Sequence, residues 1–136
     1  MGQQQLLLLV VTVILVALSI VAAFSILDRG FKQDEADGLL DRGLAIATHA
    51  VQWKATRDPF NGGNMSYERL SAGGLETLAL HDTNVRGRFA ITGASEETLE
   101  VTGVSDRYPG IGIRVYVRAY EVDSSTVDFA GGITLP

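Results

Sequence analysis

The N-terminal part of the chain is almost entirely apolar. Residues 6–27 consist of Leu, Val, Ile, Ala and Phe, relieved only by Thr12, Ser19 and Ser25, and no charged residue precedes Asp28. As an α-helix this run would be about 33 Å long, at ~1.5 Å per residue, which matches a bilayer hydrocarbon core of ~30 Å. The pattern therefore predicts an apolar transmembrane helix over residues 1–27.

A different helical pattern follows over residues 28–56. Its apolar positions share one face and are Leu39, Leu40, Leu44, Ile46, Ala47, Ala50, Val51 and Trp53. Asp34, Asp37 and Asp41 lie on the opposite side. Such a two-sided pattern is typical of a helix that packs on a core. We expect the first helix to continue as an amphipathic helix to about Lys54, because Asp58-Pro59 is a stop signal.

A loop and then a region of alternating residues complete the chain. Residues 57–74 are Gly- and Asn-rich and predict an irregular connection, with a short helical turn near 67–70. From residue 75 the hydrophobic period is two, which predicts a β-sheet over residues 75–136. The expected strands are GRFAIT (87–92), TLEVTG (98–103), IGIRVYVRAYEV (111–122) and TVDFAG (126–131), with turns at 93–97, 105–110 and 123–125 and an added edge segment at 75–80.

The predicted strands have one apolar and one polar face. The apolar face contains Phe89, Ile91, Leu99, Val101, Ile113, Val115, Val117, Val127 and Phe129, and the polar face contains Arg88, Thr92, Glu100, Arg114, Tyr116, Arg118, Tyr120 and Asp128. This is the pattern of an antiparallel sheet that is covered on one side. We therefore expect an α+β fold in which the long N-terminal helix packs its amphipathic half on a four-stranded antiparallel sheet.

Composition narrows the function classes. The 136 residues carry a net charge of −5, and all of the charge lies after residue 27. An acidic surface disfavours nucleic acid and anionic membrane surfaces as partners. The absence of cysteine excludes disulfides, thiolate metal sites and thiol catalysis.

No residue pattern indicates catalysis, a cofactor or a metal. His49 is expected to be a packed or partly exposed residue of the helix, near the face of Ala47 and Ala50, and His81 stands beside Asp82 without a nucleophile motif. The acidic residues at 34, 35, 37 and 41 do not have the spacing of a calcium loop and are expected on a solvated helix face. We therefore expect that the protein is not an enzyme.

The alternating Arg114, Tyr116, Arg118 and Tyr120 allow two interpretations. Basic and aromatic side chains on one sheet face could stack with single-stranded nucleic acid. Neutralisation across the strands by Glu100 and Asp128 accounts for the same residues more simply, and we prefer it.

The apolar segment also has two alternative readings. A secretory signal peptide needs a positive N-terminal region and an apolar run of about 7–15 residues, whereas Gly2-Gln3-Gln4-Gln5 is uncharged and the run is longer. A retained helix is therefore preferred, and a plain membrane anchor stays open as its role.

The loop after the helix contains one candidate modification site. Asn64-Met65-Ser66 is a sequon, which makes Asn64 a candidate for glycosylation.

The charge-free helix, its amphipathic continuation, the Gly/Asn-rich loop and the four-stranded sheet together resemble type IV pilins and the wider pilin-like family, which includes pseudopilins. The resemblance implies a subunit of an extracellular filament that waits in the inner membrane, is handled by a pilus assembly machinery, and polymerises with identical subunits through its apolar helix. The implied assembly core comprises Gln3, Gln4, Gln5, Leu6, Leu9, Val13, Val16, Ile20, Phe24 and Leu27.

The resemblance also draws attention to the first residues. Family precursors usually carry a short basic leader that ends in Gly, and Met1-Gly2 is the only leader-like pair here. Many members have a glutamate four residues past the mature N-terminus. If Met1 is that start, the neutral Gln5 occupies this position. The alternative role is a membrane-anchored accessory or binding domain that does not form the main filament.

Overall fold

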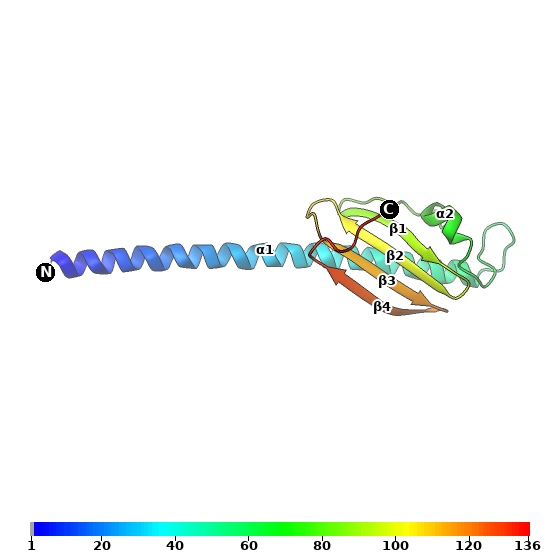
Figure 1. Ribbon diagram of the computed structural model, residues 1–136, viewed down its shortest axis with the longest axis horizontal. Helices are drawn as coiled ribbons and strands as arrows, with labels where there is room; N and C mark the ends of the chain where they lie inside the picture. Colours follow the sequence, from blue (N-terminus) through cyan, green and yellow to red (C-terminus); the bar gives the residue numbers. More distant parts are fainter. Residues whose placement is uncertain (1) are drawn as a thin grey trace. The chain divides into compact units, whose positions relative to one another are not determined.

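The computed structural model describes residues 2–136 and has the predicted α+β class. Contacts divide the chain into two compact units, one ending at Gln33 and the other comprising residues 34–136, which we call the head. Its elements, in chain order, are α1 (Gly2–Ala55), α2 (Leu70–Thr77), β1 (Gly87–Ala94), β2 (Thr98–Ser105), β3 (Gly112–Arg118) and β4 (Glu121–Asp128) (Figure 1).

The part of α1 that belongs to the first unit has no buried residue. Every residue from 2 to 33 is exposed, and the helix passes through Gly30 without a break. The neighbouring Leu, Ala, Arg and Lys residues are good helix formers, which offsets the ~1 kcal/mol that a glycine costs in a helix.

The part of α1 that belongs to the head packs on the sheet with one stripe. Leu39, Ile46, Ala47 and Ala50 are fully buried in the core. This confirms the predicted apolar face but shifts its centre, because Leu40, Leu44 and Val51 are only partly buried at its margin. The stripe begins and ends with charged residues, Glu35 and Lys54, which are buried as well.

The sheet is an antiparallel meander with the strand order β1-β2-β3-β4. The central pair β2–β3 keeps one register from Thr98↔Arg118 to Val104↔Gly112. The outer pairs do not: β1–β2 shifts between Ile91 and Gly93, and β3–β4 shifts between Tyr116 and Val117. A sheet with a regular centre and two bulged outer pairs bends most at those bulges.

The side-chain alternation of the strands is confirmed at nearly all predicted positions. The fully or almost fully buried members are Phe89, Leu99, Val101, Ile113, Val115 and Val117. Ile91 and Val127 are partly buried. Phe129 was predicted to point inward, and this is wrong: it is 49% exposed, because β4 ends at Asp128 and the alternation does not continue.

The segment before the sheet differs from the prediction. Instead of a loop to residue 74 and an edge segment at 75–80, the chain forms α2, which is kinked at Gly74 (φ 57°). Leu70 and Leu75 are both buried in the core. The helix is thus held by tertiary contacts of two leucines, and its eight residues are too few for a clear periodicity in the sequence.

The last hairpin also differs. The predicted third strand, 111–122, is interrupted at Ala119 and Tyr120, which form a two-residue turn between β3 and β4. Ala119 has φ 55°, a conformation in which glycine or asparagine is usual. Because the turn lacks these residues, the alternation appeared to run through it, and the predicted turn at 123–125 is in fact part of β4.

Candidate functional surface and buried polar contacts of the head

The apolar segment, residues 6–27 of α1, is the most prominent candidate surface. Its Leu, Val, Ile and Phe side chains are between 44% and 69% exposed, on all sides of the helix. The hydroxyl groups of Thr12 and Ser19 donate to the backbone oxygens of Leu8 and Leu15, each at 2.8 Å. The segment therefore satisfies these polar groups internally, as a helix in hydrocarbon must.

The implied assembly residues all lie on this helix. They follow at spacings of three and four from Leu6 to Leu27, which places them on one side, and Gln3, Gln4 and Gln5 precede them, exposed. That side is not distinguished from the others, because Leu8, Val11 and Leu15 are exposed in the same way. The apolar surface also extends past Leu27 to Phe31, which is 56% exposed.

By length and composition, α1 contains one stretch that could cross a membrane. A signal sequence near an N-terminus passes the same test. The structure is thus consistent with anchoring in a membrane through this helix.

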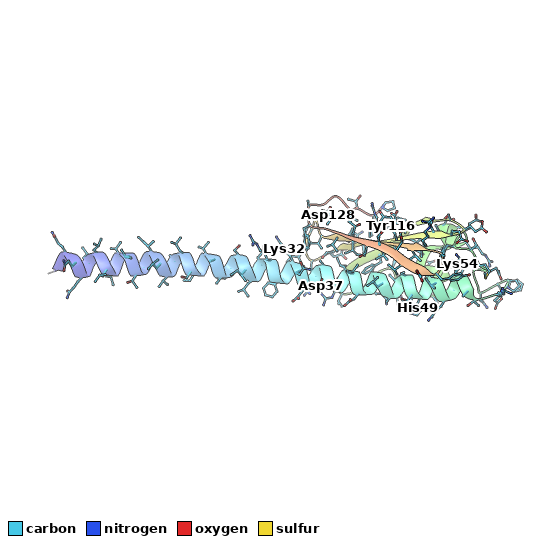
Figure 2. The ribbon with its side chains drawn as sticks, turned by 90° about the horizontal axis from the view of Figure 1, so that it is seen from below. Lys32, Asp37, His49, Lys54, Tyr116 and Asp128 are labelled. Carbon is cyan, nitrogen blue, oxygen red and sulfur yellow. The ribbon has the colours of Figure 1, made fainter. Side chains whose placement is uncertain are left out.

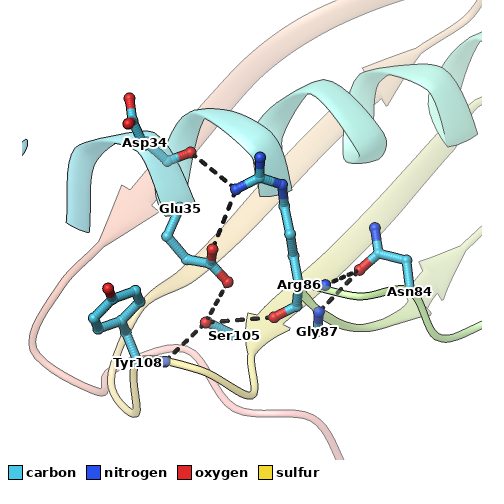
Figure 3. A network of polar contacts seen from close by, with 7 residues as sticks. All are labelled: Asp34, Glu35, Asn84, Arg86, Gly87, Ser105 and Tyr108. Atoms are coloured by element: carbon cyan, nitrogen blue, oxygen red, sulfur yellow. Dashed lines mark hydrogen bonds and ion pairs between the residues drawn. The ribbon is translucent and has the colours of Figure 1, made fainter. Parts of the chain in front are cut away.

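A buried carboxylate begins the packed part of α1 (Figure 3). Glu35 is 2% exposed, and its Oε2 lies 3.2 Å from Nη1 of Arg86. Its Oε1 accepts a hydrogen bond of 2.7 Å from the hydroxyl of Ser105, which itself accepts the N–H of Tyr108 at 3.1 Å. Both carboxylate oxygens have partners, so the charge is compensated and α1 is fixed to the segments around β1 and β2.

This contact was not predicted. Glu35 was grouped with the three exposed aspartates of the helix, whereas it lies four residues before Leu39 and eleven before Ile46, on the buried stripe. That spacing was the available signal. Gly38 belongs to the same contact, because a side chain there would collide with the guanidinium of Arg86.

A buried lysine ends the packed part of α1 (Figure 2). Lys54 is 1% exposed, and its Nζ lies 4.6 Å from the ring centre of Tyr67 and 4.7 Å from that of Tyr120. The same Nζ lies 3.5 Å from the backbone oxygen of Ala119 and 3.6 Å from Oε2 of Glu97. A lysine between two aromatic faces gains cation–π attraction in place of water. We call these five residues the lysine cluster.

Tyr67 is the second anchor of the lysine cluster. Its hydroxyl donates to the backbone oxygen of Ala119 at 2.6 Å. Burial, with smaller contributions from Tyr120 and Glu97, raises the pKa of Tyr67 to about 12. The cluster therefore fixes the end of α1 and the segment after it to the left-handed turn between β3 and β4.

The remaining candidate residues do not form a catalytic or metal site. His49 and His81 are exposed. Among residues 2–136, no three His, Asp or Glu side chains come together as they would around a metal ion. Asn64 is exposed, and its side-chain amide donates to the backbone oxygen of Asp58 at 3.1 Å.

The polar face of the sheet is partly as predicted. Nε of Arg114 lies 3.2 Å from Oε1 of Glu100 on the neighbouring strand, so this charge pair across strands is confirmed. Asp128 was predicted to neutralise an arginine, and this is wrong: it accepts the backbone N–H of Ala130 at 3.0 Å, and that bond is the main cause of its lowered pKa. Tyr120 belongs to the lysine cluster, so it does not continue the row on this face.

The chain matches no protein-family model, and comparisons with curated proteins and with solved structures find no significant match.

Proposed function

We propose that this protein is the structural subunit of an extracellular, type IV pilus-like filament that polymerises through its N-terminal hydrophobic helix. One observation carries the proposal: from Leu6 to Leu27 an exposed helix presents apolar side chains on every side and no charge. Exposure of such a surface to water is unfavourable. Contiguous exposed apolar patches of this kind mark interaction sites or membrane contacts. The subunit would reside in the inner membrane as a precursor and leave it for the helix core of a polymer.

The energetics of this transfer depend on packing. A side chain that moves from lipid to a neighbouring helix gains little hydrophobic free energy, so fit between helices must decide assembly. The segment offers small residues for close approach at Ala17, Ala22 and Ala23, among β-branched residues with few rotamers. These features support packing of helix against helix between identical copies.

The proposal assigns the glutamines at the start of the helix to contacts between subunits. Gln3, Gln4 and Gln5 are exposed and uncharged. In a dry helix core an unpaired amide costs roughly 1–3 kcal/mol, so their side chains would pair with those of neighbouring copies or with free backbone N–H groups at a helix start. Such neutral contacts would change little with pH.

The second candidate is a single-pass, membrane-anchored accessory domain that does not build the filament. The same exposed segment supports it, because a helix of this length and composition could cross a bilayer alone. Both candidates leave the protein without an enzymatic role, cofactor or metal, and with no nucleic acid as partner.

The experiment that tests the proposal compares two kinds of substitution in the apolar segment. The expected product of the unaltered chain is a filament visible by negative-stain electron microscopy. Replacing Val16 with Lys should abolish filaments, whereas Val16→Leu should preserve them. Abundant filaments with the lysine variant would exclude the helix as the core.

Charge alone does not separate a filament from an anchor, because it also disturbs membrane insertion. The double substitution Ala22→Phe and Ala23→Phe keeps the segment apolar and so keeps membrane insertion. It changes the shape of the helix, however, and should suppress filaments. If the unaltered chain is present in the membrane fraction but forms no filaments, the result supports the membrane-anchored accessory domain instead.

A further inference from the structure

A cleft with a volume of about 550 Å³ lies at one end of the sheet. Parts of all four strands contribute to it. Glu100 of β2 and Tyr116 of β3 stand directly opposite each other and line the cleft, and Tyr116 is labelled in Figure 2. Arg118 of β3 and Asp123 of β4 line it as well, and both are exposed.

The two bulges of the sheet account for the hollow. The register shift of β1–β2 precedes Gly93, and that of β3–β4 inserts Asp123 beside Tyr116. Each bulge bends an outer strand, while the regular central pair supplies the floor. Bulges next to a concave surface are a recurrent way of shaping binding sites.

Gly93 keeps the cleft open over Glu100. A Cβ at this position would lie 3.4 Å from Cβ of Glu100 and 4.0 Å from its Oε2, which is ordinary contact. The backbone would therefore accept a larger residue, but the side chain would cover the carboxylate. A glycine in a strand often marks a place where a ligand approaches closely.

The carboxylate of Glu100 is held in place by neighbouring residues but can still accept further hydrogen bonds. Oε1 of Glu100 accepts the hydroxyl of Thr92 at 2.7 Å and faces Nε of Arg114, whereas no donor among the described residues contacts Oε2. The carboxylate is thus oriented through Oε1, and the Glu100 side chain is 29% exposed. The aromatic ring of Tyr116 is half-buried between β2 and β4.

This combination discriminates between classes of ligand. Two carboxylates, Glu100 and Asp123, disfavour an anion, while Arg118 and the nearby Arg114 disfavour a cation. A hydroxyl group can donate to a carboxylate and accept from a guanidinium at once. A sugar ring also has an apolar C–H face that can lie on an aromatic ring, where tyrosine offers contact area at low entropic cost.

We propose that the cleft between Gly93, Glu100, Tyr116 and Arg118 binds a short neutral saccharide, with Tyr116 as the stacking surface and Glu100 and Arg118 as hydrogen-bonding groups. The volume lies within the ~300–1,000 Å³ that is usual for small-molecule sites. The inference goes beyond the proposed function and does not require it, because every residue of the cleft belongs to the head.

Saturation-transfer NMR on the full chain tests the proposal. The chain is kept in dodecylphosphocholine micelles, since detergents with sugar headgroups would compete. The probes are maltose, lactose, cellobiose and diacetylchitobiose at millimolar concentration. We expect at least one of them to give protein-dependent transfer, strongest on ring C–H protons. No transfer to any of the four would overturn the proposal.

Matched variants locate the binding. Tyr116→Phe keeps the ring and should retain the affinity, whereas Tyr116→Leu should weaken binding about tenfold, the loss expected for an aromatic contact. Gly93→Leu should abolish binding by filling the cleft, and Gly30→Leu, outside the head, should have no effect. The fluorescence of Trp53 in the core verifies that each variant is folded.

Two charged probes complete the test. Glucuronate and glucosamine should both bind more weakly than the best neutral disaccharide. Tighter binding of either one would show that the cleft is selective for a charge, and binding that Tyr116→Leu and Gly93→Leu leave unchanged would place the ligand elsewhere. Each of these outcomes contradicts the proposal.

Discussion

The two parts of α1 differ in where their apolar side chains lie: those of residues 34–55 are buried against the sheet, and those of residues 2–33 are exposed. Residues 34–55 have a polar and an apolar side, and the apolar side is buried on the sheet of the same chain. Residues 2–33 are helical too, but nothing within the described chain covers them. Both parts are helical, so helix formation alone does not determine whether an apolar surface is buried within the chain. The distribution of polar residues around the helix determines it.

This difference separates two kinds of mutational effect. Substitutions in residues 34–55 and in the strands should change the folding of the head, which the single tryptophan, Trp53, reports from the core. Substitutions in residues 2–33 should leave that signal unchanged and alter membrane contact or assembly.

An aspartate is expected to have opposite consequences in the two regions. Val115 is fully buried opposite α1, so Val115→Asp places an unpaired charge in the core and should unfold the head, a loss of several kcal/mol. Leu15→Asp should leave thermal unfolding of the head, followed by Trp53 fluorescence, unchanged. Arg118→Ala on the polar face is the control in the sheet and should cost well under 1 kcal/mol. Similar losses for Val115→Asp and Arg118→Ala would show that the register is wrong.

Alanine in place of glycine should also act with opposite sign along α1. At Gly38 the new methyl group displaces Arg86 and leaves the buried carboxylate of Glu35 without its ion pair, which should destabilise the head by roughly 1–3 kcal/mol. At Gly30 nothing lies within 4 Å, so the substitution should only strengthen the helix, by up to ~1 kcal/mol. Circular dichroism and Trp53 fluorescence measure the two effects. Equal effects would mean that Arg86 moves aside freely.

The two lysines provide a third comparison. Lys54→Met keeps a chain of similar length but removes the cation between two tyrosine rings, and we expect a loss of about 1–3 kcal/mol. Lys32→Met removes only an exposed ion pair with Asp28, 3.2 Å long, and should cost less than ~0.5 kcal/mol. Thermal unfolding of both variants measures the two losses of stability. A loss for Lys32→Met as large as that for Lys54→Met would argue against the lysine cluster.

The last expected effect is confined to alkaline pH. Because the pKa of Tyr67 is raised from 10.0 to about 12, the folded head keeps a phenol proton that the unfolded chain loses. Its contribution to stability is complete below pH 10 and is lost as the pH rises through about 12. In Tyr67→Phe this part of the pH dependence of the free energy of unfolding should be absent. The rise in ultraviolet absorbance from tyrosinate formation near pH 12 should be absent too. A titration of Tyr67 near pH 10 would contradict the buried contact.

Features that depend on nearest neighbours in the sequence could be predicted. The apolar segment, the amphipathic continuation and the alternation of Phe89, Leu99 and Val115 follow from local periodicity, and the structure confirms these elements. The role of the apolar segment stays a prediction, because nothing in a single chain shows what its side chains contact.

Features that depend on distant residues were missed. Glu35 is buried because Arg86, 51 positions away, compensates its charge. Lys54 is buried because the backbone oxygen of Ala119 lies 65 positions away in sequence but 3.5 Å away in space. The cleft around Tyr116 arises from two bulges that have no signature in the alternation of the strands.

The burial of Lys54 has a consequence for the chemistry of the chain. Lys32 and Lys54 are its only two lysines, and the Lys54 side chain is 1% exposed against 45% for that of Lys32. An acylating or reductively alkylating reagent should therefore modify Lys32 rapidly and Lys54 only when the end of the head opens. A fluorophore or crosslinker can thus be directed to one lysine without mutagenesis. The rate at which Lys54 is modified then measures how often the turn at Ala119 comes away from the helix.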